Sequence, residues 1–162
     1  MSSFKDAFEK AGYKGGEQHR TSTQVSQPKK QENQETMIIG KGYTAKAETV
    51  IQELKSSMGK NYQDFTTSKI RNILAMVSDI YNDLYGDQEV SLNQEIQNRI
   101  EYLKVRLIYE CGREPKVIKP FVEKAQLLPL LESIGDSSER FRSFAHYMEA
   151  LVAYHRFYGG KD

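Results

Sequence analysis

Residues 147–162 read YMEALVAYHRFYGGKD and decide the fold, because they join dense apolar spacing to a sharp ending. Together with the residues just before them, they place mainly apolar side chains at steps of three and four residues, which is the spacing of one helix face. This stripe comprises Phe141, Phe144, Ala145, Met148, Leu151, Val152 and His155. Gly159 then supplies the left-handed conformation that ends many helices. The pattern predicts a buried final helix over about residues 137–158.

The same helix carries a second apolar face. It comprises Tyr147, Ala150, Tyr154 and Phe157. A helix that is apolar on two sides is either central in its domain or exposed to a neighbouring subunit. We therefore expect Arg156, which lies next to this face, to sit near a boundary with another subunit.

Three helical patterns precede this stretch. Thr66 or Thr67 is the expected N-cap of the second, and Ser91 with Gln94 is a capping-box pair that opens the third. Gly112 is expected to end that third helix. The apolar spacing predicts these helices over about residues 44–57, 66–85 and 91–111.

A further helix is expected to begin near Pro115, since proline suits a first turn. Pro120 and Pro129 are expected to split or bend this region. Asp136 and Glu139 resemble a capping box that starts the final helix. No stretch alternates with period two over the length of a strand. The fold class is therefore all-α, a single-domain bundle of about five helices.

Residues 1–43 differ in composition from the rest. They hold many Gln, Ser and Thr and few large apolar residues, so they predict a flexible N-terminal extension before a helical domain at residues 44–162. Within the extension, Phe4, Phe8 and Ala11 lie at the spacing of a short amphipathic helix. Both a solvated tail and a docking peptide remain open.

The length, the cysteine count and the charge of the chain exclude several classes of protein. With 162 residues and one cysteine, Cys111, the chain can bury a core but cannot form an intrachain disulfide. The polar N-terminus lacks a signal-peptide core, and no apolar run approaches a membrane span. The chain is therefore expected to be cytoplasmic, with no membrane partner. The 23 basic and 22 acidic residues give a net charge of +1, so a basic site must come from segregation of charge.

Metal and acid-base sites have no support in the spacing. His146 and His155 are nine residues apart, which places them on opposite sides of one helix. Cys111 has no partner at zinc-ligand spacing, and no glycine-rich loop could hold a phosphate. We expect no metal, no cofactor and no catalytic residue.

One enzymatic alternative remains. Arg140, followed five residues later by His146, is similar to the Arg-x(4-6)-His motif of HEPN-type ribonucleases, which are all-α and dimeric. Those sites often place a polar residue after the arginine, whereas Phe141 follows here. The other interpretation of His146 is a partly exposed side chain on the flank of a packed helix.

Charge is segregated along the chain. Residues 79–95 hold acidic residues and no basic one, whereas residues 99–119 hold six basic residues against three acidic ones. Arg99 and Arg106 are seven residues apart and share a helix face, and Arg113 continues their line. Such a row could follow a polyphosphate backbone, or it could form ion pairs with Glu95, Glu110 or another subunit.

A second basic pair, Lys69 and Arg71, lies in the first turn of the predicted second helix. Free N–H groups and the positive dipole end make such a turn suitable for phosphate. The two side chains are about 200° apart around the axis, so we expect one to bind phosphate while the other pairs with protein.

Three segments carry a family resemblance through their order and spacing: TTSKIRNILAMVSDIYND (66–83), RIEYLKVRLIYECGRE (99–114) and YMEALVAYHRFYGGKD (147–162). Together they resemble the small subunit of type III-A CRISPR effector (Csm) complexes. The resemblance covers about residues 44–162 and implies a small helical, non-catalytic protein that stacks in multiple copies in an antiviral ribonucleoprotein. It also implies contact with guide RNA and target RNA, and with the backbone and large subunits.

The resemblance implies which basic side chains face RNA. The contacts would be made to the backbone and be independent of sequence, because base pairing with the guide supplies the sequence reading. The RNA-facing candidates are Lys69, Arg71, Arg106, Arg113 and Arg156.

Overall fold

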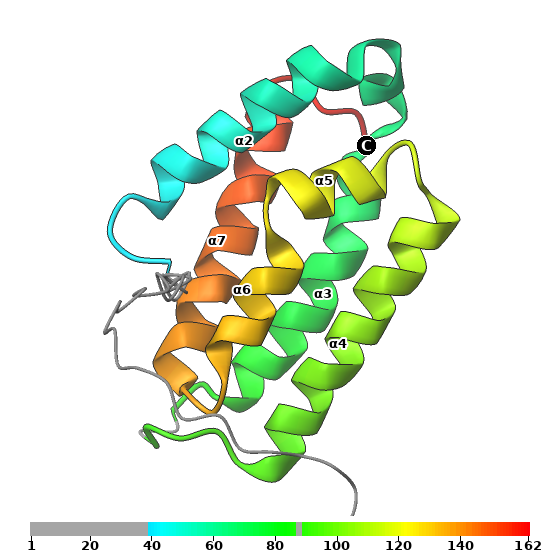
Figure 1. The fold of residues 1–162 in the computed structure, drawn as a ribbon. Helices are drawn as coiled ribbons and strands as arrows, with labels where there is room; N and C mark the ends of the chain where they lie inside the picture. The colour runs from blue at the N-terminus through cyan, green and yellow to red at the C-terminus, as the bar shows by residue number, and fades with distance from the viewer. Residues whose placement is uncertain (1–38, 87–88) are drawn as a thin grey trace, which may run out of the picture. The chain divides into compact units, whose positions relative to one another are not determined.

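The computed structural model describes residues 39–86 and 89–162, and their regular structure is helical (Figure 1). The predicted N-terminal extension and its amphipathic segment fall almost entirely outside these residues. The elements are α2 (Tyr43–Met58), the 3-10 helix η1 (Gly59–Asp64), α3 (Thr67–Asp83), α4 (Gln94–Arg113), α5 (Ile118–Lys124), α6 (Leu127–Ile134) and α7 (Ser138–Phe157). The all-α class is confirmed, and residues 39–86 and 89–162 form six α-helices where about five were predicted.

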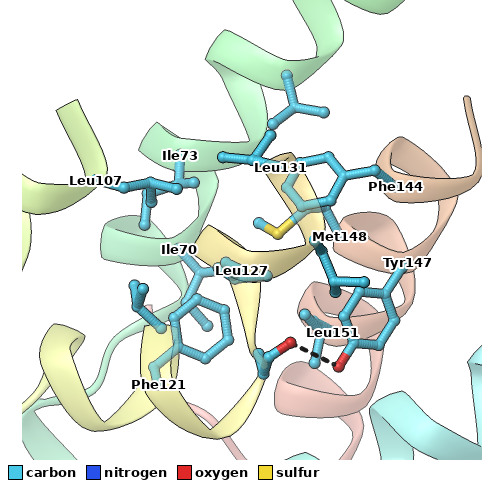
Figure 2. Close-up of a cluster of buried hydrophobic side chains, with 14 of the residues drawn as sticks. Ile70, Ile73, Leu107, Phe121, Leu127, Leu131, Phe144, Tyr147, Met148 and Leu151 are labelled. Carbon is cyan, nitrogen blue, oxygen red and sulfur yellow. Dashed lines mark hydrogen bonds between the residues drawn. The ribbon is translucent and has the colours of Figure 1, made fainter. Parts of the chain in front are cut away.

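α7 is central, as its apolar spacing predicted. It packs against α2, α3 and α6, and Phe141, Phe144 and Leu151 are fully buried. Side chains from α3, α4, α5 and α6 meet those of α7 in one buried cluster (Figure 2). The second face divides along the helix, since Tyr147 is buried whereas Phe157 is 77 % exposed.

Tyr147 shows how the core accepts a polar group. Its hydroxyl donates a hydrogen bond to the carbonyl oxygen of Ala125, at 3.3 Å (Figure 2). Burial raises the pKa of the Tyr147 phenol well above its usual value, so the group stays neutral. A buried phenol therefore joins α7 to the end of α5.

The proline-rich region forms two helices, which explains the additional element. Pro120 is the third residue of α5 and Pro129 is the third residue of α6, so each lies in a first turn, where its missing N–H removes no helical bond. Between them Gln126 adopts a left-handed conformation, with φ of 57°. The expected start at Pro115 is wrong, because α5 begins at Ile118.

Two predicted N-caps are wrong by one or two residues. α4 is capped by Asn93, whose side chain accepts a hydrogen bond from the N–H of Ile96 at 2.9 Å. Ser91 instead forms an isolated antiparallel bridge with Ser137, which itself caps α7 in place of Asp136. The expected cap at Thr66 is confirmed, because its side chain accepts a hydrogen bond from the N–H of Lys69. The expected cap at Gly159 is confirmed by its positive φ.

The predicted end of α4 at Gly112 is also wrong. α4 continues to Arg113, so Gly112 is a helical residue and Glu114 follows as the C-cap. This extension keeps Arg113 on the same helix as Arg106. None of the helices within the described ranges is long and apolar enough to cross a membrane.

Candidate nucleic-acid interface

Three of the five predicted RNA-facing side chains line one groove between α3 and α4, which run side by side (Figure 1). Lys69 comes from the first turn of α3, whereas Arg106 and Arg113 come from the second half of α4. The volume of this α3–α4 groove is about 230 Å³. Its lining residues are Lys69, Asn72, Ile73, Met76, Arg106, Glu110 and Arg113.

Glu110 lies between the two arginines. Its Oε2 is 2.7 Å from Nη2 of Arg113, and its Oε1 is 3.6 Å from Nη2 of Arg106. The Glu110 side chain is only 13 % exposed, whereas the exposed fractions of Arg106 and Arg113 are 40 % and 53 %. A guanidinium has five N–H donors, so one contact to Glu110 leaves each arginine able to bind phosphate. Glu110 therefore fixes the spacing of the two cations.

Lys69 is held at the other side of the groove. Its Nζ is 3.1 Å from Oε2 of Glu114, and both side chains are less than one-third exposed. Lys69 also borders a neighbouring hollow of about 540 Å³, which is lined by η1, by the N-cap Thr66 and by Pro115 and Lys116. The ion-pair interpretation of these cations is confirmed, and the phosphate interpretation stays a prediction, because the pairs leave the cations at an open surface.

Arg71 and Arg156 meet elsewhere, through one acidic side chain. Oδ1 of Asp162 is 3.0 Å from Nη1 of Arg156 and 4.0 Å from Nη1 of Arg71. Nη1 of Arg156 also donates to the carbonyl oxygen of Gly160, at 3.1 Å. The predicted site residues therefore form two groups, one in the α3–α4 groove and one at residues 158–162, which we name the C-terminal clasp.

Backbone hydrogen bonds hold the clasp against the start of α3 (Figure 1). The N–H of Thr67 donates to the carbonyl oxygen of Lys161 at 2.6 Å, and the N–H of Gly160 donates to that of His155 at 2.8 Å. The Thr66 side chain accepts from the N–H of Lys69. In the first turn of α3, the N–H groups of Thr67 and Lys69 therefore already have protein acceptors, so the expectation of free N–H groups is wrong for these two residues.

His155 lies fully buried beneath the clasp. Its Nε2 is 2.7 Å from the carbonyl oxygen of Phe65, and its Nδ1 is 3.4 Å from Oγ1 of Thr67. Because a carbonyl oxygen only accepts, Nε2 carries the hydrogen and Nδ1 accepts from Thr67. Burial lowers the pKa of His155 and outweighs the opposing effect of the Phe65 hydrogen bond, so the ring is neutral. His155 has a structural role.

The outer surface of α4 carries an apolar stripe that the sequence reasoning missed. Four side chains, each more than half exposed, form this α4 stripe: Tyr102, Val105, Ile108 and Tyr109. Arg106 lies over the ring of Tyr109, with 5.5 Å from its Cζ to the ring centroid. The steps of three and four residues from Tyr102 to Tyr109, opposite the buried Leu103 and Leu107, were the signal that could have revealed it.

Arg140 and His146 line a common hollow of about 870 Å³. Each already has a partner within the fold. Nη1 of Arg140 donates to the carbonyl oxygen of Ser133 at 2.9 Å, and Nε2 of His146 is 3.3 Å from Oη of Tyr81. The His146 ring also stacks on Tyr43. These contacts fit the structural interpretation of His146 on the flank of a packed helix.

The part of the chain that the structure describes contains no cluster of metal-ligating side chains. No group of three or more His, Cys, Asp or Glu side chains in residues 39–86 and 89–162 could hold a metal ion. Cys111 is half-buried, and desolvation, followed by the charge of Glu123, raises the pKa of its thiol. A raised pKa disfavours the thiolate that metal binding requires.

Comparison with known proteins identifies the family. The family described as Csm2 Type III-A matches residues 42–161. A Streptococcus thermophilus relative, described as CRISPR system Cms protein Csm2, is 41 % identical over 126 residues, which cover 78 % of this chain and 98 % of the relative. A Mycobacterium tuberculosis (strain ATCC 25618 / H37Rv) relative with the same description is 36 % identical over 125 residues, or 77 % and 98 % of the two chains. The chain therefore belongs to the Csm2 family, the small subunit of the type III-A CRISPR Csm complex.

Proposed function

We propose that the chain is a non-catalytic subunit of the Csm complex that contacts the backbone of guide RNA and target RNA through basic side chains. The helical domain at residues 44–162 carries these contacts, and residues 1–43 form an extension of it. Several copies stack beside the backbone and large subunits in the cytoplasm. The contacting side chains are Lys69, Arg71, Arg106, Arg113 and Arg156.

The observation that carries the proposal is the α3–α4 groove. Lys69, Arg106 and Arg113 come from two helices and line one surface, although 44 positions separate the outer two (113 − 69). Arginine suits phosphate because its planar fork binds two oxygens at once. Such contacts carry no sequence information, as is required of a subunit that accepts any guide.

Glu110 strengthens this interpretation. It holds both guanidinium groups at a fixed separation, so they lose less freedom when they bind an anion. A carboxylate that only neutralised them would not need to be nearly buried between them. The groove is therefore arranged in advance for two backbone contacts.

The α4 stripe supports assembly with protein. Two tyrosines, a valine and an isoleucine exposed side by side are typical of a surface that another subunit covers. The near-neutral net charge of +1 removes a general repulsion between copies. Stacked copies of this kind continue until a different subunit ends the row.

The test is target RNA binding by the assembled complex. Replacing Arg106 or Arg113 by Ala should weaken binding by about two- to tenfold, the effect of losing one net hydrogen bond of roughly 0.5–1.5 kcal/mol. The loss should be the same for unrelated guides, with a shallower salt dependence. Lys119→Ala is the matched control, because Lys119 pairs with Glu123 on the surface and does not line the groove. Unchanged affinity in both arginine variants would reject the groove as an RNA surface.

A further inference from the structure

The two arginine groups are paired with acids of very different kinds. Glu110 is 13 % exposed and uses both of its oxygens, one for each arginine of the groove. Asp162 is 65 % exposed and reaches Arg156 and Arg71 with a single oxygen, at 3.0 and 4.0 Å. Glu110 is therefore a fixed brace, whereas the Asp162 carboxylate is held weakly at the surface.

The clasp does not depend on the Asp162 side chain. Its backbone is fixed by the bonds from Thr67 to Lys161 and from Gly160 to His155, and Nζ of Lys161 adds a contact to Gln63 at 3.3 Å. The Asp162 carboxylate can rotate away while these bonds remain. Its displacement therefore costs only two exposed ion pairs.

The position of Oδ1 is the one that a backbone phosphate oxygen would take. It is an anionic acceptor between two guanidinium groups that come from different helices, α3 and α7. A backbone phosphodiester carries one negative charge and two non-bridging oxygens, as a carboxylate does, so it can replace Asp162 on both arginines.

The geometry points to Asp162 as a displaceable internal competitor for RNA phosphate at Arg71 and Arg156. This inference rests on the proposed function, since it takes RNA backbone as the ligand. Asp162 lowers the affinity of this second site for RNA phosphate. A phosphate must also be placed to contact both arginines if it is to displace Asp162. The α3–α4 groove has no such displaceable competitor, because Glu110 stays between its two arginines.

The experiment measures target RNA affinity of the assembled, guide-loaded complex, with two unrelated guide sequences and a series of salt concentrations. Asp162→Asn keeps the shape and an acceptor oxygen but removes the charge. Affinity should rise by about two- to fivefold, as expected from removing a competing exposed ion pair. The slope of log affinity against log salt should stay the same, because the phosphate contacts both arginines in the wild type and in the variant.

Glu123→Gln controls for a general change of charge. Glu123 matches Asp162, because it is also 65 % exposed and pairs through one oxygen, 3.9 Å from Lys119. Its affinity and salt slope should equal those of the wild type. A gain equal to that of Asp162→Asn would overturn the proposal, because the effect would then be long-range charge alone.

The remaining outcomes separate this inference from the proposed function. If Arg71→Ala and Arg156→Ala weaken binding but Asp162→Asn leaves it equal or weaker, the competitor role is wrong and the RNA contact stands. If neither arginine variant nor those of the groove alter binding, the proposed function fails, and the competitor role fails with it. Thermal melts of each variant show whether the clasp is still folded.

Discussion

Replacing Gly160 by alanine should destabilise the protein through one contact. A Cβ built at Gly160 would lie 1.9 Å from Nδ1 and 2.0 Å from Cε1 of His155, and 2.7 Å from its carbonyl oxygen. The His155 ring is fully buried and bound to Phe65, so it cannot move aside. The clasp must therefore shift, and the hydrogen bonds from Gly160 to His155 and from Thr67 to Lys161 are strained or lost.

The magnitude follows from these contacts. Two backbone hydrogen bonds contribute about 1 kcal/mol each, and overpacking a closely packed site costs about 1–3 kcal/mol. Gly160 does not have a positive φ, so backbone strain adds nothing. We expect the free energy of unfolding to fall by about 3–5 kcal/mol, a large part of the roughly 5–15 kcal/mol of a typical domain.

Urea denaturation, followed by circular dichroism, measures this change at constant m-value. Gly112→Ala is the matched control, because a Cβ there meets no atom within 4 Å and the residue is helical. That variant should be more stable than the wild type by about 0.5–1 kcal/mol. A Gly160→Ala protein within about 0.5 kcal/mol of the wild type would refute the packing of the clasp on His155.

Two further predictions concern pH and capping. The pKa of His155 is lowered in the folded state, so only the unfolded chain gains a proton as the pH falls below about 6.5. The free energy of unfolding should therefore drop by at most about 1.4 kcal/mol per pH unit, until the folded pKa is reached. Urea titrations across this range check it, and equal stability throughout would contradict it. Asn93→Ala should cost about 1 kcal/mol, whereas Ser91→Ala should change stability by less than about 0.5 kcal/mol. Thermal melts that reverse this order would contradict the assignment of the cap.

The helices could be predicted from the sequence wherever burial alone decides them. The steps from Phe141 to Leu151 specify one face of α7, and burying that face supplies the largest stabilising contribution. Gly159 was predictable for a different reason, since its φ of 83° favours a residue without a Cβ. Both signals are local, so they need no knowledge of the rest of the fold.

Helix starts were less predictable, because neighbouring residues compete for the same role. Ser91 and Asn93 are both good N-caps, and the bridge from Ser91 to Ser137 decides between them. That bridge joins two loops 46 positions apart (137 − 91), so no local pattern contains it. Ser137, the other residue of this bridge, is the N-cap of α7.

The candidate interface was predicted in part. The seven-residue spacing predicted a helix face shared by Arg99 and Arg106 and continued by Arg113, and the last two residues line the groove. Glu110 was one of the expected ion-pair partners, and the structure confirms its pairs with Arg106 and Arg113. The pairing of Arg71 with Arg156 through Asp162 could not be predicted, because it depends on how the clasp folds back onto α3.

A structure of the chain within its assembled complex, bound to guide RNA and target RNA, tests the central claim most directly. The account predicts guanidinium nitrogens of Arg106 and Arg113 at about 2.7–3.1 Å from phosphate oxygens, with Glu110 still between them. It also predicts protein against the α4 stripe. An α3–α4 groove that faces solvent or another subunit, with no phosphate near either arginine, would contradict the account.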